Sequence, residues 1–223
     1  MSLSKIEVLG SSSSGCAYVL YFDNGKVYQL DAGVKNPKKE LVNKLFISHD
    51  HPDHIKYAKD YKDVIYQFDG DRRDNLEEQN FYESFLIPHR TLNNGYYIKE
   101  DDSAIGYITD CGDFEGIKNL DLSKLDFLFI EANWDPLAIS QKRLFAAEHA
   151  KYSFSKVGHM STIDCLRALV KWNVNKNCKI IFIHKSSQHT IYPDSFKLFD
   201  ILPNQWHVAK AGDIIYCKSW KVV

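Results

Sequence analysis

The chain has 223 residues, 44% of them hydrophobic, and its 28 lysines and arginines against 29 aspartates and glutamates leave a formal net charge of −1. A chain of this length buries roughly 70% of the surface that its unfolded form exposes, enough for one domain without disulfides. The near-neutral charge excludes a histone-like polyelectrolyte but leaves room for local basic patches.

The first half of the chain is predicted to form a series of short strands. Apolar runs rich in β-branched and aromatic residues predict strands at 6–9, 17–22, 27–30, 44–47, 64–66 and 85–87. Asp23-Asn24-Gly25 is typical of a tight hairpin turn. The serines at 11–14, followed by Gly15, predict a second turn between strands.

The second half mixes strands with a helical pattern. We expect a turn at residues 93–95 (Asn-Asn-Gly) and strands at 96–98 and 105–108. Near-continuous apolar runs predict strands covered on both faces at 127–130 and 179–183. Residues 161–172 have helical spacing, with Ser161 or Thr162 as the cap. The expected apolar stripe of this helix consists of Ile163, Leu166, Leu169 and Val170.

The sequence contains no repeat, low-complexity tract or long linker. It therefore predicts a single domain spanning residues 1–223, with two mixed sheets packed face to face and helices outside. Five widely spaced cysteines without a CxxC motif favour a reducing, cytoplasmic compartment. No apolar run approaches the roughly 20 residues of a membrane span, and the N-terminus lacks the apolar stretch of a signal peptide. We therefore expect no membrane partner.

The segment at 49–54 carries three imidazoles and a carboxylate in an HxHxDH pattern directly after a predicted strand. Histidine nitrogen and aspartate oxygen suit zinc, manganese or iron without a thiolate. His49 and His51 can point to one ion on a tight loop, and Asp53 and His54 can reach a second after Pro52 turns the chain. The alternative is a solvated polar loop with a helix-capping aspartate.

Three further candidate ligands, His89, Asp110 and His184, each follow a strand-like run. Strand ends are rigid platforms, so these side chains can converge with the accuracy that a metal site needs. Read alone, each residue also suits a structural or turn position. Together with the HxHxDH segment, they predict one metal centre.

The order of these motifs resembles that of the metallo-β-lactamase-fold hydrolases. Residues 30–33 (Leu-Asp-Ala-Gly) are similar to the family's first motif, and residues 49–54 to its second. His89, Asp110 and His184 then correspond to the third, fourth and fifth motifs. The resemblance implies an αββα sandwich without a cap domain and a dinuclear site at one edge. It also implies two divalent ions per chain, with Zn²⁺ expected first and Mn²⁺ or Fe²⁺ as alternatives.

The same resemblance implies a role for each ligand. One ion is expected on His49, His51 and His89, the other on Asp53, His54 and His184, with Asp110 as the bridge. Asp31 is expected to orient the ligand loop. The expected catalytic residues are Asp53, Asp110 and His159.

A closer resemblance is to the YycJ/WalJ-like nucleases. It is carried by GSSSSG at 10–15, ITDCG at 108–112, EAN at 131–133 and GHMS at 158–161. The chain departs from that pattern at Arg90, where relatives carry an acidic residue, and at Lys185, where they carry leucine. The candidate substrate-binding residues are Arg90, Asn133, His159, Ser161 and Lys185.

The leading hypothesis is a phosphodiesterase or nuclease that uses a metal-bridging hydroxide to cleave DNA or RNA. Two divalent ions carry a charge of +4, and Asp53, Asp110 and one hydroxide carry −3 together. The remaining charge of +1 favours an anionic substrate such as nucleic acid. His159 is a candidate donor to a phosphate or to the leaving group. Local packing at the start of a helix is the alternative for this residue.

Two other functions stay open. The same site suits a carboxyl-ester, lactone or thioester hydrolase, for which Trp134, Phe145 and Phe154 would supply an apolar pocket. The other is a non-catalytic module that binds metal or nucleic acid. The sequence leaves the oligomeric state open.

Overall fold

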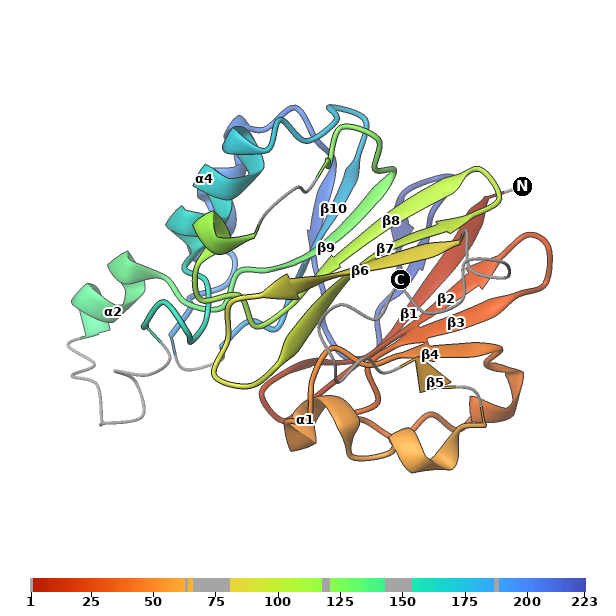
Figure 1. The fold of residues 1–223 in the computed structure, drawn as a ribbon. Helices are drawn as coiled ribbons and strands as arrows, with labels where there is room; N and C mark the ends of the chain where they lie inside the picture. The colour runs from red at the N-terminus through yellow and green to blue at the C-terminus, as the bar shows by residue number, and fades with distance from the viewer. Residues whose placement is uncertain (1, 63, 66–80, 118–120, 143–153, 187–188) are drawn as a thin grey trace.

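Two mixed β-sheets pack face to face, with helices on their outer sides, in the computed structural model of the chain (Figure 1). The structure describes residues 2–62, 64–65, 81–117, 121–142, 154–186 and 189–223. Tyr66, at the end of a predicted strand, and Phe145, in the predicted apolar pocket, lie outside the described residues. The two-sheet architecture confirms the fold class predicted from the sequence.

The first sheet has seven strands in the order β13-β12-β1-β2-β3-β4-β5. Its strands are β1 (Leu3–Ser12), β2 (Gly15–Phe22), β3 (Val27–Leu30), β4 (Lys44–Phe46), β5 (Val64–Ile65), β12 (Ile214–Tyr216) and β13 (Lys221–Val222). β2 and β3 form the predicted hairpin, with Gly25 at a φ of 85° in the turn. β3, β4 and β5 are parallel, so their carboxyl ends share one edge of the sheet.

The second sheet has six strands in the order β11-β10-β9-β8-β7-β6. Its strands are β6 (Tyr82–Ile87), β7 (Asn93–Glu100), β8 (Ser103–Ile108), β9 (Phe127–Glu131), β10 (Lys179–Ile183) and β11 (Trp206–Val208). β8, β9, β10 and β11 are parallel, and β7 is antiparallel to both β6 and β8. The carboxyl ends of β6, β8, β9 and β10 therefore meet at the same edge.

The predicted turn at 93–95 is wrong, because these three residues open β7. Asn93 pairs with Ile87 across the ladder, and its side-chain amide donates to the carbonyls of Thr109 and Asp110. The third residue, Gly95, leaves room for the Phe85 ring, whose Cε2 lies 2.3 Å from where a Cβ would stand. The Asn-Gly pair serves cross-strand packing here instead of a reverse turn.

The helices are short. They are α1 (Pro52–Ile55), α2 (Pro136–Lys142) and α4 (Thr162–Lys171), with 3₁₀ helices η1 (Lys39–Leu41), η2 (Ala58–Asp60), η3 (Phe114–Gly116) and η4 (Asp194–Ile201). The helix α4 lies on the outer side of the six-stranded sheet and α1 on that of the seven-stranded sheet, whereas α2 projects beyond the sheets (Figure 1). Ser161 caps α4 as predicted. Of the predicted apolar stripe, Leu169 is buried and Leu166 packs against the core, but Val170 lies on the exposed face. Val170 is 65% exposed, whereas Cys165 and Ala168 are fully buried.

Three apolar clusters explain the layers. The largest lies between the sheets and includes Tyr18, Tyr96 and Phe129. The second joins the outer face of the six-stranded sheet to α4 and η4, and a small third cluster packs Leu45 and Ile47 beneath α1 and η2. All five cysteines are free and buried, as expected without a disulfide framework. Within the described part of the chain, no helix has the length and apolar character of a membrane span.

Candidate metal centre

The candidate ligands gather because the carboxyl ends of the parallel strands meet at one edge of the sandwich. Asp31 directly follows β3, Asp110 is the second residue after β8, and His184 directly follows β10. All three adopt positive φ angles, 54°, 50° and 53°. Backbone in this region is unfavourable for residues other than glycine, and such strain is concentrated at functional sites.

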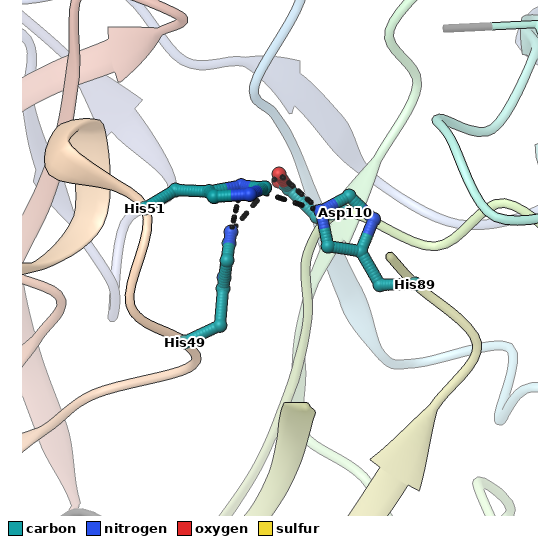
Figure 2. A group of neighbouring side chains, drawn as sticks. All are labelled: His49, His51, His89 and Asp110. Atoms are coloured by element: carbon teal, nitrogen blue, oxygen red, sulfur yellow. Dashed lines mark hydrogen bonds and ion pairs between the residues drawn. The ribbon is translucent and has the colours of Figure 1, made fainter. Parts of the chain in front are cut away.

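One group of ligand atoms comes from His49, His51, His89 and Asp110 (Figure 2). His49 Nε2 lies 2.8 Å from His51 Nδ1, and His51 Nδ1 lies 3.4 Å from His89 Nε2. Asp110 Oδ2 approaches the Nε2 atoms of His49 and His89 at 3.4 and 3.7 Å. Three imidazoles and one carboxylate oxygen therefore point at one position from three separate segments of the chain.

Burial favours the neutral form of two imidazoles of this group, those of His49 and His89. Burial lowers the pKa of His49 to about 2 and also lowers the pKa of His89, in both cases against the pull of Asp110. The Nδ1 atom of His89 donates to the Gly158 carbonyl at 3.2 Å, which leaves the lone pair on Nε2. Neutral rings with converging lone pairs are the form in which histidine binds a metal.

A second group consists of Asp53, His54, His184 and the other oxygen of Asp110. The Nε2 atoms of His54 and His184 lie 3.5 and 3.3 Å from the same oxygen, Asp53 Oδ2. Asp110 Oδ1 lies 3.5 Å from His54 Nε2 and 3.5 Å from His184 Nδ1. Asp110 thus presents one oxygen to each group, as a bridging carboxylate would.

The electrostatics of the second group favour positive charge. Burial alone would lower the pKa of His54 and His184, but Asp110 raises both well above the usual range. Burial alone would raise the pKa of Asp110 and Asp53, but the neighbouring histidines hold both well below their usual values. A buried cluster of ionised carboxylates requires a compensating cation.

Asp31 holds His54 in one tautomer. The carboxylate accepts a hydrogen bond from His54 Nδ1 at 2.6 Å, two from the Ser48 amide and hydroxyl, and one from Tyr107 Oη. Because a carboxylate can only accept, His54 Nδ1 carries a proton and Nε2 is the ligand atom. This places Asp31 where an orienting residue must lie.

Glu131, at the end of β9, holds His184 in one tautomer, as Asp31 does for His54. The sequence did not identify Glu131 as a site residue. Its fully buried carboxylate accepts from His184 Nδ1 at 3.0 Å and from the amides of Cys111 and Met160 at 2.8 and 3.2 Å. The EAN motif carried the signal, but a glutamate that ends an apolar strand is not by itself distinguishable from a residue at the strand's solvated end.

Glu131 also binds His159. Its Oε1 accepts from His159 Nδ1 at 2.6 Å, and the His159 ring stacks on that of His184 with centroids 5.0 Å apart. Burial alone would lower the pKa of His159, but the carboxylates of Glu131 and Asp110 raise it. The His159 side chain is 20% exposed, so its imidazole lies at the solvent-exposed side of the cluster.

The remaining predicted substrate contacts are spread more widely. The amide of Asn133 donates to the His184 carbonyl at 2.6 Å and so positions the ligand loop. Ser161 Oγ accepts from the Asp164 amide at 3.0 Å and donates to its carboxylate at 2.8 Å, which makes Ser161 a helix cap. Arg90 is exposed beside His89, and Lys185 is half-buried beside His184.

The donor set fits divalent ions. His54 Nε2 is completely buried and has no hydrogen-bond partner among the described residues. Such an orphaned nitrogen is costly unless it binds a cation. Nitrogen and carboxylate oxygen are ligands that zinc, manganese and iron accept.

Solved structures share this fold. The metallo-β-lactamase-fold protein YhfI from Bacillus subtilis aligns with a TM-score of 0.67 and 14% identity, over 95% of this chain and 98% of its own. Zinc-bound PqqB from Methylobacterium extorquens aligns with a TM-score of 0.63 and 11% identity, over 95% and 99%. The short form of human tRNase Z aligns with a TM-score of 0.60 and 13% identity, over 95% and 98%. The chain has the metallo-β-lactamase fold.

At the sequence level, the chain is similar to exodeoxyribonuclease WalJ of two Streptococcus pneumoniae strains. The identity is 25% over 226 aligned positions, covering 84% of this chain and 83% of WalJ. No protein-family model matches the sequence. The likeness agrees with the YycJ/WalJ-like resemblance of the motifs.

Proposed function

We propose that this protein is a metal-dependent phosphodiesterase that cleaves DNA or RNA. The observation that carries the proposal is the convergence of the His49 and His54 groups on the two oxygens of Asp110, with His159 at the open side of the cluster. The relative WalJ, named an exodeoxyribonuclease, and the alignment with tRNase Z support a nucleic-acid substrate. The residues expected to hold the two ions are His49, His51, Asp53, His54, His89, Asp110 and His184.

Divalent ions in this centre would supply an activated water and compensation for the charge that develops on a phosphate. The chain supplies the rest. Asp31 and Glu131 fix the tautomers of His54 and His184, so the Nε2 atoms of both rings face Asp53 in a defined orientation. Burial lowers the pKa of His159 but Glu131 raises it, and the ring is placed to donate a hydrogen bond to phosphate or a proton to the leaving oxygen.

Charge around the centre suits an anionic substrate. Glu131 adds a negative charge that the sequence-based charge count left out, and His159 offsets it at 2.6 Å. Burial lowers the pKa of Lys185, and repulsion from Lys210 lowers it further. Lys185 directly follows His184 in the chain, and together with Lys210 it would attract a phosphodiester backbone.

Incubation with labelled single- and double-stranded DNA and RNA, first with Zn²⁺ and then with Mn²⁺, tests the proposal. We expect cleavage that a chelator abolishes and added metal restores. Replacement of His159 with alanine should reduce kcat and leave the metal content unchanged. Metal-loaded protein that cleaves none of the four substrates would overturn the proposal.

A carboxyl-ester, lactone or thioester hydrolase is the second candidate, favoured by one observation. The rings of Trp134 and Phe154 pack with centroids 4.4 Å apart, and Trp134 Nε1 donates to the His159 carbonyl at 2.9 Å. This aromatic pair would form an apolar wall near the centre. Rates on chromogenic esters compared with bis-aryl phosphates separate the two functions, and faster turnover of the esters would favour the second.

A further inference from the structure

A thiol lies next to the second group of ligands. Cys16 is the second residue of β2, and its side chain is fully buried. Its Sγ atom and one ring nitrogen each of His54 and His184 all lie within 4.8 Å of one another. The expected ligand set from the sequence contained no sulfur.

The backbone holds this thiol in place from two sides. Gly33 donates its amide to the Cys16 carbonyl at 2.9 Å, and a Cβ on Gly33 would stand 1.7 Å from the Asp53 carbonyl oxygen. Only a glycine permits this approach of β2 to the ligand helix α1. On the other side, Ser11 pairs with Cys16 across the sheet, and its hydroxyl accepts the amide of His184 at 3.2 Å.

The nitrogen atoms beside the thiol indicate a ligand position. His54 Nε2 is buried and has no hydrogen-bond partner among the described residues, and both it and His184 Nε2 face Asp53 Oδ2. The thiol makes a long contact, 3.5 Å from Sγ to the Ser12 carbonyl, and it also interacts with the side chains of His184 and Tyr18. A cation at this position would satisfy the orphaned nitrogen and would have a sulfur atom within reach.

We propose that Cys16 is a thiolate ligand of the ion held by Asp53, His54 and His184, which makes this position selective for zinc. The inference rests on the proposed metal-dependent function. Metal binding would release the thiol proton to solvent, and the new metal–sulfur bond would replace the contact to the Ser12 carbonyl. A thiolate is a soft ligand that favours zinc over manganese, whereas the group around His49 has only nitrogen and oxygen.

X-ray absorption at the zinc edge of the zinc-loaded wild-type protein tests this directly. We expect a sulfur shell at about 2.3 Å, present at one sulfur for every two zinc ions, beside nitrogen and oxygen at about 2.0–2.2 Å. Cys16→Ser should remove the sulfur shell. Cys217→Ser is the matched control, since Cys217 is 1% exposed in the same core cluster and should leave the spectrum unchanged.

A spectrum of wild-type protein with two zinc ions and only nitrogen and oxygen ligands overturns the thiolate proposal and leaves the hydrolase proposal standing. Cobalt substitution provides a second readout. The wild-type protein and Cys217→Ser should show a sulfur-to-cobalt charge-transfer band that Cys16→Ser lacks, and its absence from all three would also contradict the proposal. If the wild-type chain retains no metal, both the thiolate proposal and the hydrolase proposal are overturned. Nuclease assays test the hydrolase proposal separately, because they do not depend on which atoms bind the ion.

Discussion

Replacement of Asp31 with asparagine isolates the contribution of the buried carboxylate to metal binding. Asparagine keeps the size of the side chain but turns one acceptor oxygen into a donor. If the asparagine oxygen keeps the hydrogen bond from the Ser48 amide, the NH₂ group takes the place of Asp31 Oδ2. In the wild type this oxygen lies 2.6 Å from His54 Nδ1 and also accepts from Tyr107 Oη. The amide can then bond to His54 only as a donor, which moves the imidazole proton to Nε2 and blocks the ligand atom.

Two effects of different size follow. Each buried donor left unsatisfied costs about 1–3 kcal/mol, and two are at risk here, so the free energy of unfolding should fall measurably without metal. Loss of the orienting carboxylate should weaken metal binding at the His54 position about 10–100-fold, or about 1.4–2.7 kcal/mol. Affinity for an ion at the His49 position should change much less.

Zinc titrations against a competing chelator, combined with thermal unfolding with and without zinc, measure both effects. Asp213→Asn is the matched control, because Asp213 accepts from His207 Nε2 at 2.7 Å in a partly exposed pair outside the metal centre. The reasoning is refuted if Asp31→Asn folds and binds two zinc ions with the wild-type affinities.

Three further changes test separate parts of the site. Gly33→Ala should lower Tm and zinc affinity together because its Cβ would collide with the Asp53 carbonyl; wild-type values of both would show that the backbone yields easily. Ser161→Ala should cost about 1 kcal/mol of stability by removing the α4 cap, with kcat unchanged, whereas a raised KM at constant stability would make Ser161 a substrate contact. Although burial opposes it, Glu131 raises the pKa of His159, and an acid that must be protonated loses activity as pH rises through its pKa. Glu131→Gln should therefore shift the alkaline limb of kcat/KM to lower pH, and an unmoved limb would exclude His159 as that acid.

Most strands were predictable because their apolar runs are short and bounded by strong turn residues. Residues 179–183 form β10 as predicted, and the Asn-Gly turn after β2 forms the expected hairpin. The second Asn-Gly failed because turn propensity is local, whereas Gly95 is required by the ring of Phe85 on the neighbouring strand. The α4 stripe was right for Leu169 but wrong for Val170, because the small residues Cys165 and Ala168 complete the buried face of the helix.

The candidate ligands that the structure brings together could be predicted where they belong to a dense motif. HxHxDH concentrates candidate ligands within six residues, and the strand ends explain how distant side chains join them. Neither Glu131 nor Cys16, the ligand proposed above, was predictable as a candidate site residue, since each lies within a strand and its neighbours depend on how the sheets pack. From the sequence, Ser161 was predicted both as a helix cap and as a candidate substrate-binding residue. Its hydrogen bonds to Asp164 show that it caps α4.

Anomalous diffraction from crystals of the zinc-loaded protein is the most direct test of the account, because it locates each ion independently of activity. We predict two zinc peaks on either side of Asp110, one bounded by His49, His51 and His89 and the other by His54 and His184. A single peak elsewhere, or no peak between these side chains at saturating zinc, would contradict the account.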